Sequence, residues 1–175
     1  MAPPGTANFR FEELSSRDLD ALARWFPKQT WPFHGRSRVD DAWVRERAAE
    51  GFFWGDDARA FWIFGDGLEP LGVIRVFELA DVTPLVDLRI ADSARRHGVG
   101  TAALDWITSF VFEHYPAIHR LGGYTRKDNL GMLKLFEKCG FTKEAVHREA
   151  WRLEDGGFTD AIGYAIIRPK ASESN

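Results

Sequence analysis

The stretch Arg95-Arg96-His97-Gly98-Val99-Gly100-Thr101 decides the fold of this chain, because it joins a short strand to a long helix. Upstream of it, residues 85–90 are predicted to form a strand. Downstream, residues 100–115 have the spacing of an amphipathic helix. Its apolar face is expected to consist of Val99, Ala103, Trp106, Ile107, Phe110 and Val111. The next strand, residues 118–125, follows this helix, so the two strands are expected to be a parallel pair.

The loop has the features of an anion-binding site. Gly98 and Gly100 allow the backbone to approach a ligand closely and to adopt conformations closed to other residues. The free N–H groups at the start of the helix, together with its dipole, attract negative charge. Three basic side chains stand beside them: Arg95, Arg96 and His97. The stretch therefore predicts a site for phosphate or pyrophosphate.

Other glycine loops fit this stretch less well. A P-loop ends in Gly-Lys-Ser/Thr, which is absent here. A dinucleotide-binding loop has a third glycine where this chain has Ala103, and the usual acidic residue after the next strand is missing. Taken alone, the loop could still be a turn that merely needs glycine.

Two further segments extend the pattern. They are Thr125-Arg126-Lys127-Asp128-Asn129 and Phe136-Glu137-Lys138-Cys139-Gly140-Phe141. Together with Arg95-x-x-Gly98-x-Gly100, Arg148 and the turn at residues 155–160, they resemble the GCN5-related N-acetyltransferases (GNAT), in particular the RimJ/RimL-like branch. The resemblance covers about residues 71–168, and the first 70 residues fit only in the order of their elements.

The resemblance implies an α/β fold with a mixed, mostly antiparallel sheet, a central splayed pair of parallel strands and flanking helices. It implies acetyl-CoA as the acyl donor, lying between those two strands. The backbone of Leu88, Arg89 and Ile90 would bind the pantetheine, and the loop from Arg95 to Thr101 would bind the pyrophosphate. Asn129 and Phe136 would also contact the cofactor; as an alternative, Asn129 caps the helix that follows it.

The implied chemistry is direct attack of an amine on the thioester, which requires a group that accepts a proton. Asp87 is the first candidate base, because it lies on the strand beside the thioester; its alternative role is an ion pair with Arg89 or another basic residue. Glu78 is the second candidate. Many members of the family protonate the thiolate with a Tyr where this chain has Phe136, and some use a Ser where it has Met132. Water or Tyr124 would then supply the proton, although Tyr124 is also typical of a half-buried sheet residue.

The acceptor is expected to meet the aromatic loop near the N-terminus. Trp31, Phe33 and His34 are the candidate substrate-binding residues, and they would suit an amine with an apolar body. Some of these aromatics could instead fill the core, and His34 could be a surface residue. A protein N-terminus, a small amine, an amino acid and an aminoglycoside-type antibiotic all stay open. The resemblance to the RimJ/RimL branch favours a peptide α-amine slightly.

The expected element order is β-α-α-β-β-β-α-β-α-β-β in a single domain, residues 1–175, with flexible tails at 1–7 and 170–175. The formal net charge of −3 argues against nucleic acid as a partner. One cysteine, Cys139, and the absence of a Cys/His pattern argue against a metal site. With no membrane span expected, the chain is predicted to be cytoplasmic, and the edges of its terminal hairpin leave a homodimer possible.

Two rival functions remain at this stage. A non-catalytic acyl-CoA-binding module that acts as a sensor or regulator would explain the missing hydroxyls at Phe136 and Met132. A protein that binds another nucleotide phosphate on the same loop is the second rival.

Overall fold

The computed structural model describes residues 8–170, so the tails predicted at residues 1–7 and 170–175 lie outside the described residues, except for Lys170. One seven-stranded sheet has the order β1-β2-β3-β4-β5-β7-β6. Its strands are β1 (Arg10–Glu13), β2 (Ala58–Phe64), β3 (Pro70–Phe77), β4 (Leu85–Ile90), β5 (Arg120–Arg126), β6 (Thr142–Arg152) and β7 (Phe158–Ile167). The helices are α1 (Leu19–Trp25), α2 (Asp41–Ala49), α3 (Val99–His114) and α4 (Leu130–Lys138). This is the predicted order of elements.

The parallel pair in the centre of the sheet is β4 and β5, and all other neighbouring strands are antiparallel. Within the described residues, β4 and β5 pair at one register position only, Leu85 opposite Gly122. There the N–H of Gly122 donates to the carbonyl of Pro84 at 2.9 Å. Beyond this point no ladder joins the two strands, so they part towards their C-terminal ends. The predicted fold class, with its splayed central pair, is confirmed.

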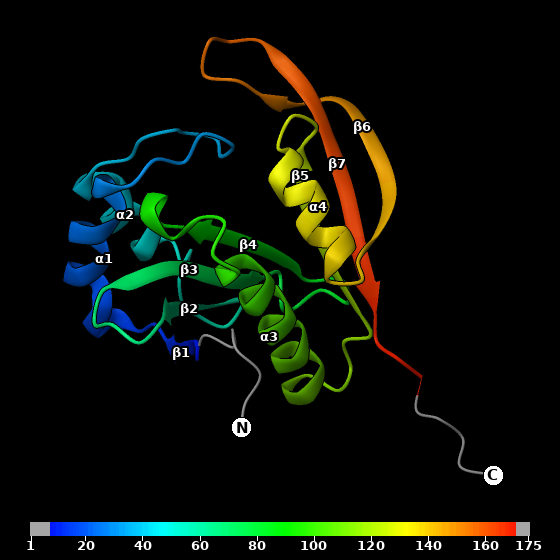
Figure 1. Cartoon of the computed structure of the whole chain (residues 1–175), viewed down its shortest axis with the longest axis horizontal. Helices are drawn as coiled ribbons and strands as arrows, with labels where there is room; N and C mark the ends of the chain where they lie inside the picture. Colours follow the sequence, from blue (N-terminus) through cyan, green and yellow to red (C-terminus); the bar gives the residue numbers. More distant parts are fainter. Residues whose placement is uncertain (1–7, 171–175) are drawn as a thin grey trace.

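The helices cover both faces of the sheet, and neighbouring residues of one strand show this directly. On β2, Phe61 contacts Trp106 of α3, whereas Trp62 meets Trp25 of α1 edge to face at 5.3 Å. Side chains alternate along a strand, so α3 and α1 lie on opposite faces. Figure 1 shows α3 and α4 together on one side of the sheet, with α1 and α2 away from them.

Local signals explain most of the element ends. Ser15 and Asp18 form a capping box that starts the first helical segment, and Pro27 restricts its end to a short 3-10 turn, Phe26–Lys28. Asp40 caps α2 by accepting a hydrogen bond from the N–H of Trp43 at 2.8 Å. Gly140 ends α4 with a φ of 82°, which is the left-handed conformation that favours glycine.

The loop between α1 and α2, residues 29–39, is called the strap here because it crosses from one half of the molecule to the other. The backbone N–H of Ser37 donates to the carboxylate of Glu154 at 2.7 Å, in the turn of the β6–β7 hairpin. Arg126 of β5 donates to the carbonyl of Pro32 at 3.1 Å. In Figure 1 the strap reaches from α1 and α2 towards the hairpin, so it lies over the place where β4 and β5 part.

Candidate functional site

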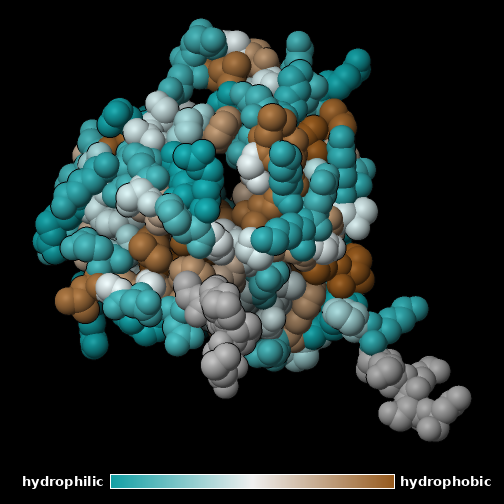
Figure 2. Space-filling model, in the orientation of Figure 1, coloured by the Kyte–Doolittle hydropathy of each residue, from teal (hydrophilic) through white to brown (hydrophobic). Residues whose placement is uncertain are grey.

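A cavity of about 390 Å³ lies between the strap, the end of β4 and the first turns of α3 and α4. Figure 2 shows a hollow between α4 and the half of the molecule that holds α1 and α2, with apolar surface in its depth. The lining residues come from four separate segments of the chain. They are Trp31, Pro32, Phe33, His34, Leu88, Ile90, Ala94, Arg95, Arg96, Gly98, Gly100, Thr101, Asn129, Gly131, Met132 and Leu135.

One end of the cavity is built to hold an anion. Gly98 is the N-cap of the 16-residue helix α3, so no side chain caps this helix. The first turn of the helix contains no acidic residue. Gly98 has a φ of 81° and Arg96 a φ of 64°, so the loop turns through the left-handed region twice before the helix begins. The first N–H groups of the helix therefore stay available to a ligand. The exposed side chain of Arg96 adds positive charge beside them.

Arg95 makes structural contacts within the chain, and its predicted role in cofactor binding stays a prediction. Its guanidinium donates to the carbonyls of Ile90 and Thr30 and forms an ion pair with Asp92 at 2.8 Å. Thr30 in turn donates its backbone N–H and its hydroxyl to Asp92. Arg95 lines the cavity, but these contacts chiefly tie the strap to the loop after β4.

The middle of the cavity is apolar. Leu88 and Ile90 of β4 form one wall, and Met132 and Leu135 of α4 form the other. Gly100 allows close packing here, since a Cβ at that position would lie 3.0 Å from the side chain of Leu135, which would have to shift. A passage that leads to a helix N-terminus fits a ligand with a long, narrow arm and a pyrophosphate, and coenzyme A is such a ligand.

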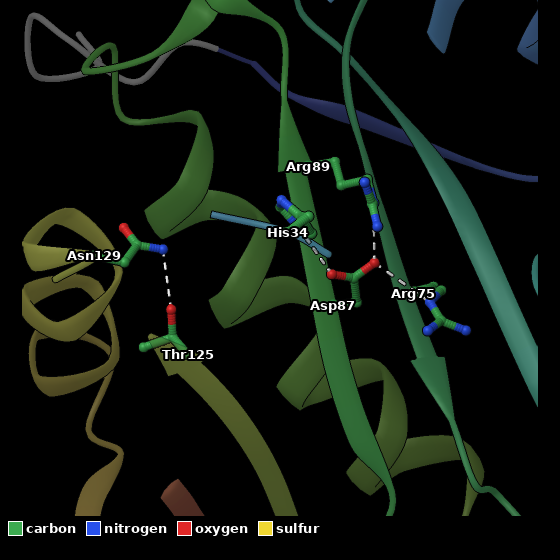
Figure 3. Close-up of polar contacts among 6 residues, drawn as sticks. All are labelled: His34, Arg75, Asp87, Arg89, Thr125 and Asn129. Atoms are coloured by element: carbon green, nitrogen blue, oxygen red, sulfur yellow. Dashed lines mark hydrogen bonds and ion pairs between the residues drawn. The ribbon is translucent and has the colours of Figure 1, made fainter. Parts of the chain in front are cut away.

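Asn129 joins α4 to β5 at the edge of this passage. Its Oδ1 accepts from the N–H of Met132 at 3.2 Å, and its Nδ2 donates to the hydroxyl of Thr125 at 3.0 Å. The alternative role as a helix cap is therefore observed, while its role as a cofactor contact stays a prediction. Figure 3 shows this pair across from a second polar group centred on Asp87.

Asp87 is the centre of a partly buried polar cluster. Its Oδ1 lies 3.1 Å from Nε2 of His34, and its Oδ2 accepts from Arg89 at 3.2 Å and from Arg75 at 3.4 Å. Arg75 faces Asp87 because the two residues are paired across β3 and β4. The three side chains converge on the carboxylate in Figure 3. The alternative role predicted for Asp87, an ion pair with basic neighbours, is thus observed.

The cations of this cluster are held by aromatic rings. The guanidinium of Arg75 lies 3.4 Å from the ring centroid of Phe52 and 4.0 Å from that of Phe77. Arg89 is buried and lies 5.5 Å from the ring centroid of Trp31. Such contacts stabilise a desolvated cation, so both arginines are fixed in place around the carboxylate.

The cluster sets the charge of both of its titratable members. Burial alone would raise the pKa of Asp87, but Arg89, His34 and Arg75 hold it well below its ordinary value. Burial and then Arg89 lower the pKa of His34 below its ordinary 6.5, although Asp87 acts in the opposite direction. At neutral pH, Asp87 is therefore ionised and His34 is neutral.

Two buried polar atoms of cavity-lining residues have no hydrogen-bond partner in the part of the chain that the structure describes. They are Nδ1 of His34 and Nε1 of Trp31. A buried polar group without a partner costs about 1–3 kcal/mol. A ligand that donates to His34 and accepts from Trp31 would remove that cost, so the strap side of the cavity is suited to a polar reacting group.

Several predicted site residues lie outside the lining of the cavity. Glu78 is exposed beyond β3, beside the N-terminal end of β4, where the sheet is still paired. Tyr124 is half exposed and packs edge to face on His147 at 5.5 Å. Phe136 is buried in the core, stacked on Tyr164 at 5.0 Å. Val99 is also buried in the core, and His97 is exposed on the loop.

Some residues of the site were not predicted from the sequence. The apolar wall of α4, with Gly131 and Leu135, faces the cavity because Asn129 starts that helix; its spacing could have identified this face. Arg75 could be found only through the register of β3 against β4. Among residues 8–170, no group of three or more His, Cys, Asp and Glu side chains could hold a metal ion. No helix in the same range is long and apolar enough to span a membrane.

Comparisons with known proteins identify the family and the fold. A family model described as an acetyltransferase (GNAT) domain matches residues 8–142. No curated protein matches the sequence.

Solved structures share the fold at low sequence identity. A spermidine N-acetyltransferase from Vibrio cholerae, in complex with CoA and spermine, superposes with a TM-score of 0.77 at 15% identity, covering 91% of this chain and 95% of that one. RimL, a ribosomal L7/L12 alpha-N-protein acetyltransferase in complex with coenzyme A, gives 0.76 at 18%, covering 94% and 97%. The ribosomal-protein-S18-alanine N-acetyltransferase from Escherichia coli gives 0.72 at 16%, covering 96% and 99%.

Proposed function

The chain belongs to the GNAT family of N-acetyltransferases, which use acetyl-CoA, and on that premise we propose that it acetylates a primary amine, with a peptide α-amine as its acceptor. The observation that carries the proposal is the cavity, which connects an uncapped helix N-terminus to the polar cluster at His34 and Asp87 through an apolar passage. An acyl-CoA has the matching sequence of groups: a pyrophosphate, a narrow pantetheine arm and a reactive thioester.

In this proposal each part of the cofactor has a defined partner. The N–H groups of Val99, Gly100 and Thr101 and the side chain of Arg96 bind the pyrophosphate. The backbone of Leu88, Arg89 and Ile90 continues along the pantetheine, because β4 has no ladder partner towards β5 over these residues. The thioester then reaches the strap at Trp31 and His34.

The charge of the lining supports a peptide α-amine over a polyamine. Among the described residues that line the cavity there is no Asp or Glu, while Arg95 and Arg96 are both cationic. The partly buried cluster beside it also holds two arginines to one carboxylate. A polyamine would therefore find no carboxylate in this lining to bind its additional cationic groups. An α-amine has a pKa near 8, so a useful fraction of it is neutral at physiological pH. The motifs shared with the RimJ/RimL branch support the same acceptor.

The thiolate receives its proton from water in this proposal. Neither Met132 nor Phe136 carries a hydroxyl, and Tyr124 does not line the cavity. The strap and the aromatic side chain of Phe33 hold the body of the acceptor, since Arg126 lies 5.5 Å from the ring centroid of Phe33 and fixes its position.

The test is release of CoA thiol from acetyl-CoA with a panel of acceptors: short peptides with free N-termini, spermidine, single amino acids and an aminoglycoside. We expect turnover with the peptides, and none with the same peptides blocked at the N-terminus. Turnover with spermidine alone would overturn the assignment of the acceptor. Binding of ATP or NAD more tightly than CoA, measured by titration calorimetry, would overturn the assignment of the cavity.

A further inference from the structure

We propose that His34 is the general base of the acetyl transfer, accepting the amine proton at Nδ1, and that Asp87 is a positioning residue that holds the imidazole. This inference rests on the proposed function, because it assigns a role within the same reaction. It reverses the roles expected from the sequence, in which Asp87 was the base and His34 a substrate contact.

The tautomer of His34 follows from its partner. Asp87 is ionised, so its Oδ1 can only accept, and the contact at 3.1 Å requires a hydrogen on Nε2 of His34. In the neutral imidazole the other nitrogen, Nδ1, then carries a free lone pair. Nδ1 is the buried atom without a partner on a residue that lines the cavity. An amine N–H is the donor that would complete its hydrogen bonding.

Asp87 itself is poorly suited to accept a proton. Both of its oxygens are occupied, Oδ1 by His34 and Oδ2 by Arg75 and Arg89. Two adjacent cations make the carboxylate a very weak base. Asp87 is also absent from the lining of the cavity. Its geometry instead matches that of a carboxylate that orients a catalytic imidazole.

The charged groups around His34 come from several elements. Asp87 and Arg89 belong to β4, and Arg75 of β3 reaches the far side of the carboxylate. Arg95, in the loop after β4, also acts on His34 by its charge. Arg126 of β5 binds the strap at Pro32, two residues away. Arg89 and Arg95 disfavour the imidazolium form of His34 directly by their charge. Arg75 disfavours it indirectly, because it competes with His34 for Asp87. The base is therefore unprotonated at neutral pH.

The step balances without any other reagent. The neutral amine attacks the thioester carbon, the C–N bond forms and the C–S bond breaks. As the C–N bond forms, the amine nitrogen becomes positively charged and its proton much more acidic, so it passes to Nδ1 of His34. The thiolate that leaves takes a proton from water, and the imidazolium returns its proton to solvent. The products are an amide and the free thiol.

The experiment compares His34→Gln with wild type, using a peptide that the wild-type enzyme acetylates. Gln can still donate to Asp87 but cannot take up a proton. We expect kcat to fall by about 100- to 10,000-fold, the range of general-base catalysis, while the Kd for CoA stays within about twofold. In wild type, kcat at saturating peptide should show an acid limb that lies below pH 6.5, because the pKa of His34 is lowered from its ordinary value; in the variant this acid limb should be absent.

Two further variants separate catalysis from structure. His119→Gln replaces an exposed histidine between α3 and β5 and should leave both kcat and its pH profile unchanged. Asp87→Asn should lower kcat less than His34→Gln and move the acid limb to lower pH, because the carboxylate favours the imidazolium. A merely structural role for His34 would lower the melting temperature or CoA affinity without removing the limb.

The outcomes are distinguishable from failure of the proposed function. If wild type acetylates no peptide, the assigned acceptor is wrong. If wild type is active and His34→Gln keeps its kcat and its acid limb, the assignment of the base is wrong. An acid limb that stays at the same pH in Asp87→Asn would remove the positioning role from that carboxylate.

Discussion

Gly98 and Gly100 show how two residues of one motif can be required for different physical reasons. Gly98 has a φ of 81° and open space around its Cα, so its requirement is conformational. Gly100 is helical, and a Cβ there would lie 3.0 Å from a methyl group of Leu135 and 3.6 Å from Leu88. The first glycine shapes the anion site, and the second keeps the α3–α4 junction close to β4.

Replacement of Gly98 by Ala should therefore act through the backbone alone. A left-handed conformation costs an L-residue about 1–2 kcal/mol, so the loop should lose its shape and CoA should bind about five- to thirtyfold more weakly. Titration calorimetry with CoA measures this. Gly67→Ala is the matched control, since Gly67 has open space and no positive φ. Equal affinity in both variants would show that the loop geometry does not bind the cofactor.

At the scale of elements, Asn129 ties the start of α4 to the end of β5. Asn129 holds the helix N-terminus with one side-chain atom and the end of β5 with another. On the opposite side, hydrogen bonds hold the strap at three points, through Arg126, Ser37 and Thr30. β4 and β5 keep their ladders with β3 and β7, and the cavity between them is closed by the strap and α4, which are held by hydrogen bonds at the ends of elements.

Two substitutions at Asn129 should separate its two bonds. Asn129→Asp keeps an acceptor for the N–H of Met132 but loses the donor to Thr125. Asn129→Ala loses both, and the loss of the cap should cost about 1 kcal/mol in the free energy of unfolding. In urea denaturation the free energy of unfolding should be highest for wild type, lower for Asn129→Asp and lowest for Asn129→Ala. CoA affinity should fall in both variants if the tie to β5 shapes the passage; unchanged affinity in Asp would contradict that role.

At the scale of the whole molecule, the site exists only where the two halves of the chain meet. His34 and Asp87 are 53 residues apart in sequence, and Ser37 and Glu154 are 117 apart. Docking the strap buries an imidazole against Arg89 and a carboxylate. That arrangement couples the stability of the fold to pH, because the folded chain binds a proton at His34 less readily than the unfolded chain does.

Stability should therefore fall on acidification, beginning near pH 6.5. The pKa of His34 is lower in the folded state than in the unfolded state, so between the two values the unfolded chain binds more protons and acid favours unfolding. The pKa of Asp87 is also depressed in the folded state, so the stabilisation that its carboxylate contributes is lost only below about pH 3.9. Urea midpoints from pH 8 to pH 5 should decline more steeply in wild type than in His34→Gln. The difference in slope is at most about 1.4 kcal/mol per pH unit for one proton. Parallel curves would show that His34 has the same pKa in both states.

The sequence by itself determined the order of elements, the central parallel pair and the position of the glycine loop before α3, because these depend on local signals: helical spacing, glycine positions and N-caps such as Asp40 and Asn129. It also identified Asp87 as a candidate site residue, since alternation along a strand shows which residues share a face. It could not assign roles within the cluster. Only the tertiary structure placed His34 on Asp87, paired Arg75 with it across two strands, and buried Phe136 against Tyr164. The charge and free lone pairs of such groups depend on neighbours distant in sequence, and these neighbours are set by packing, which no local pattern records.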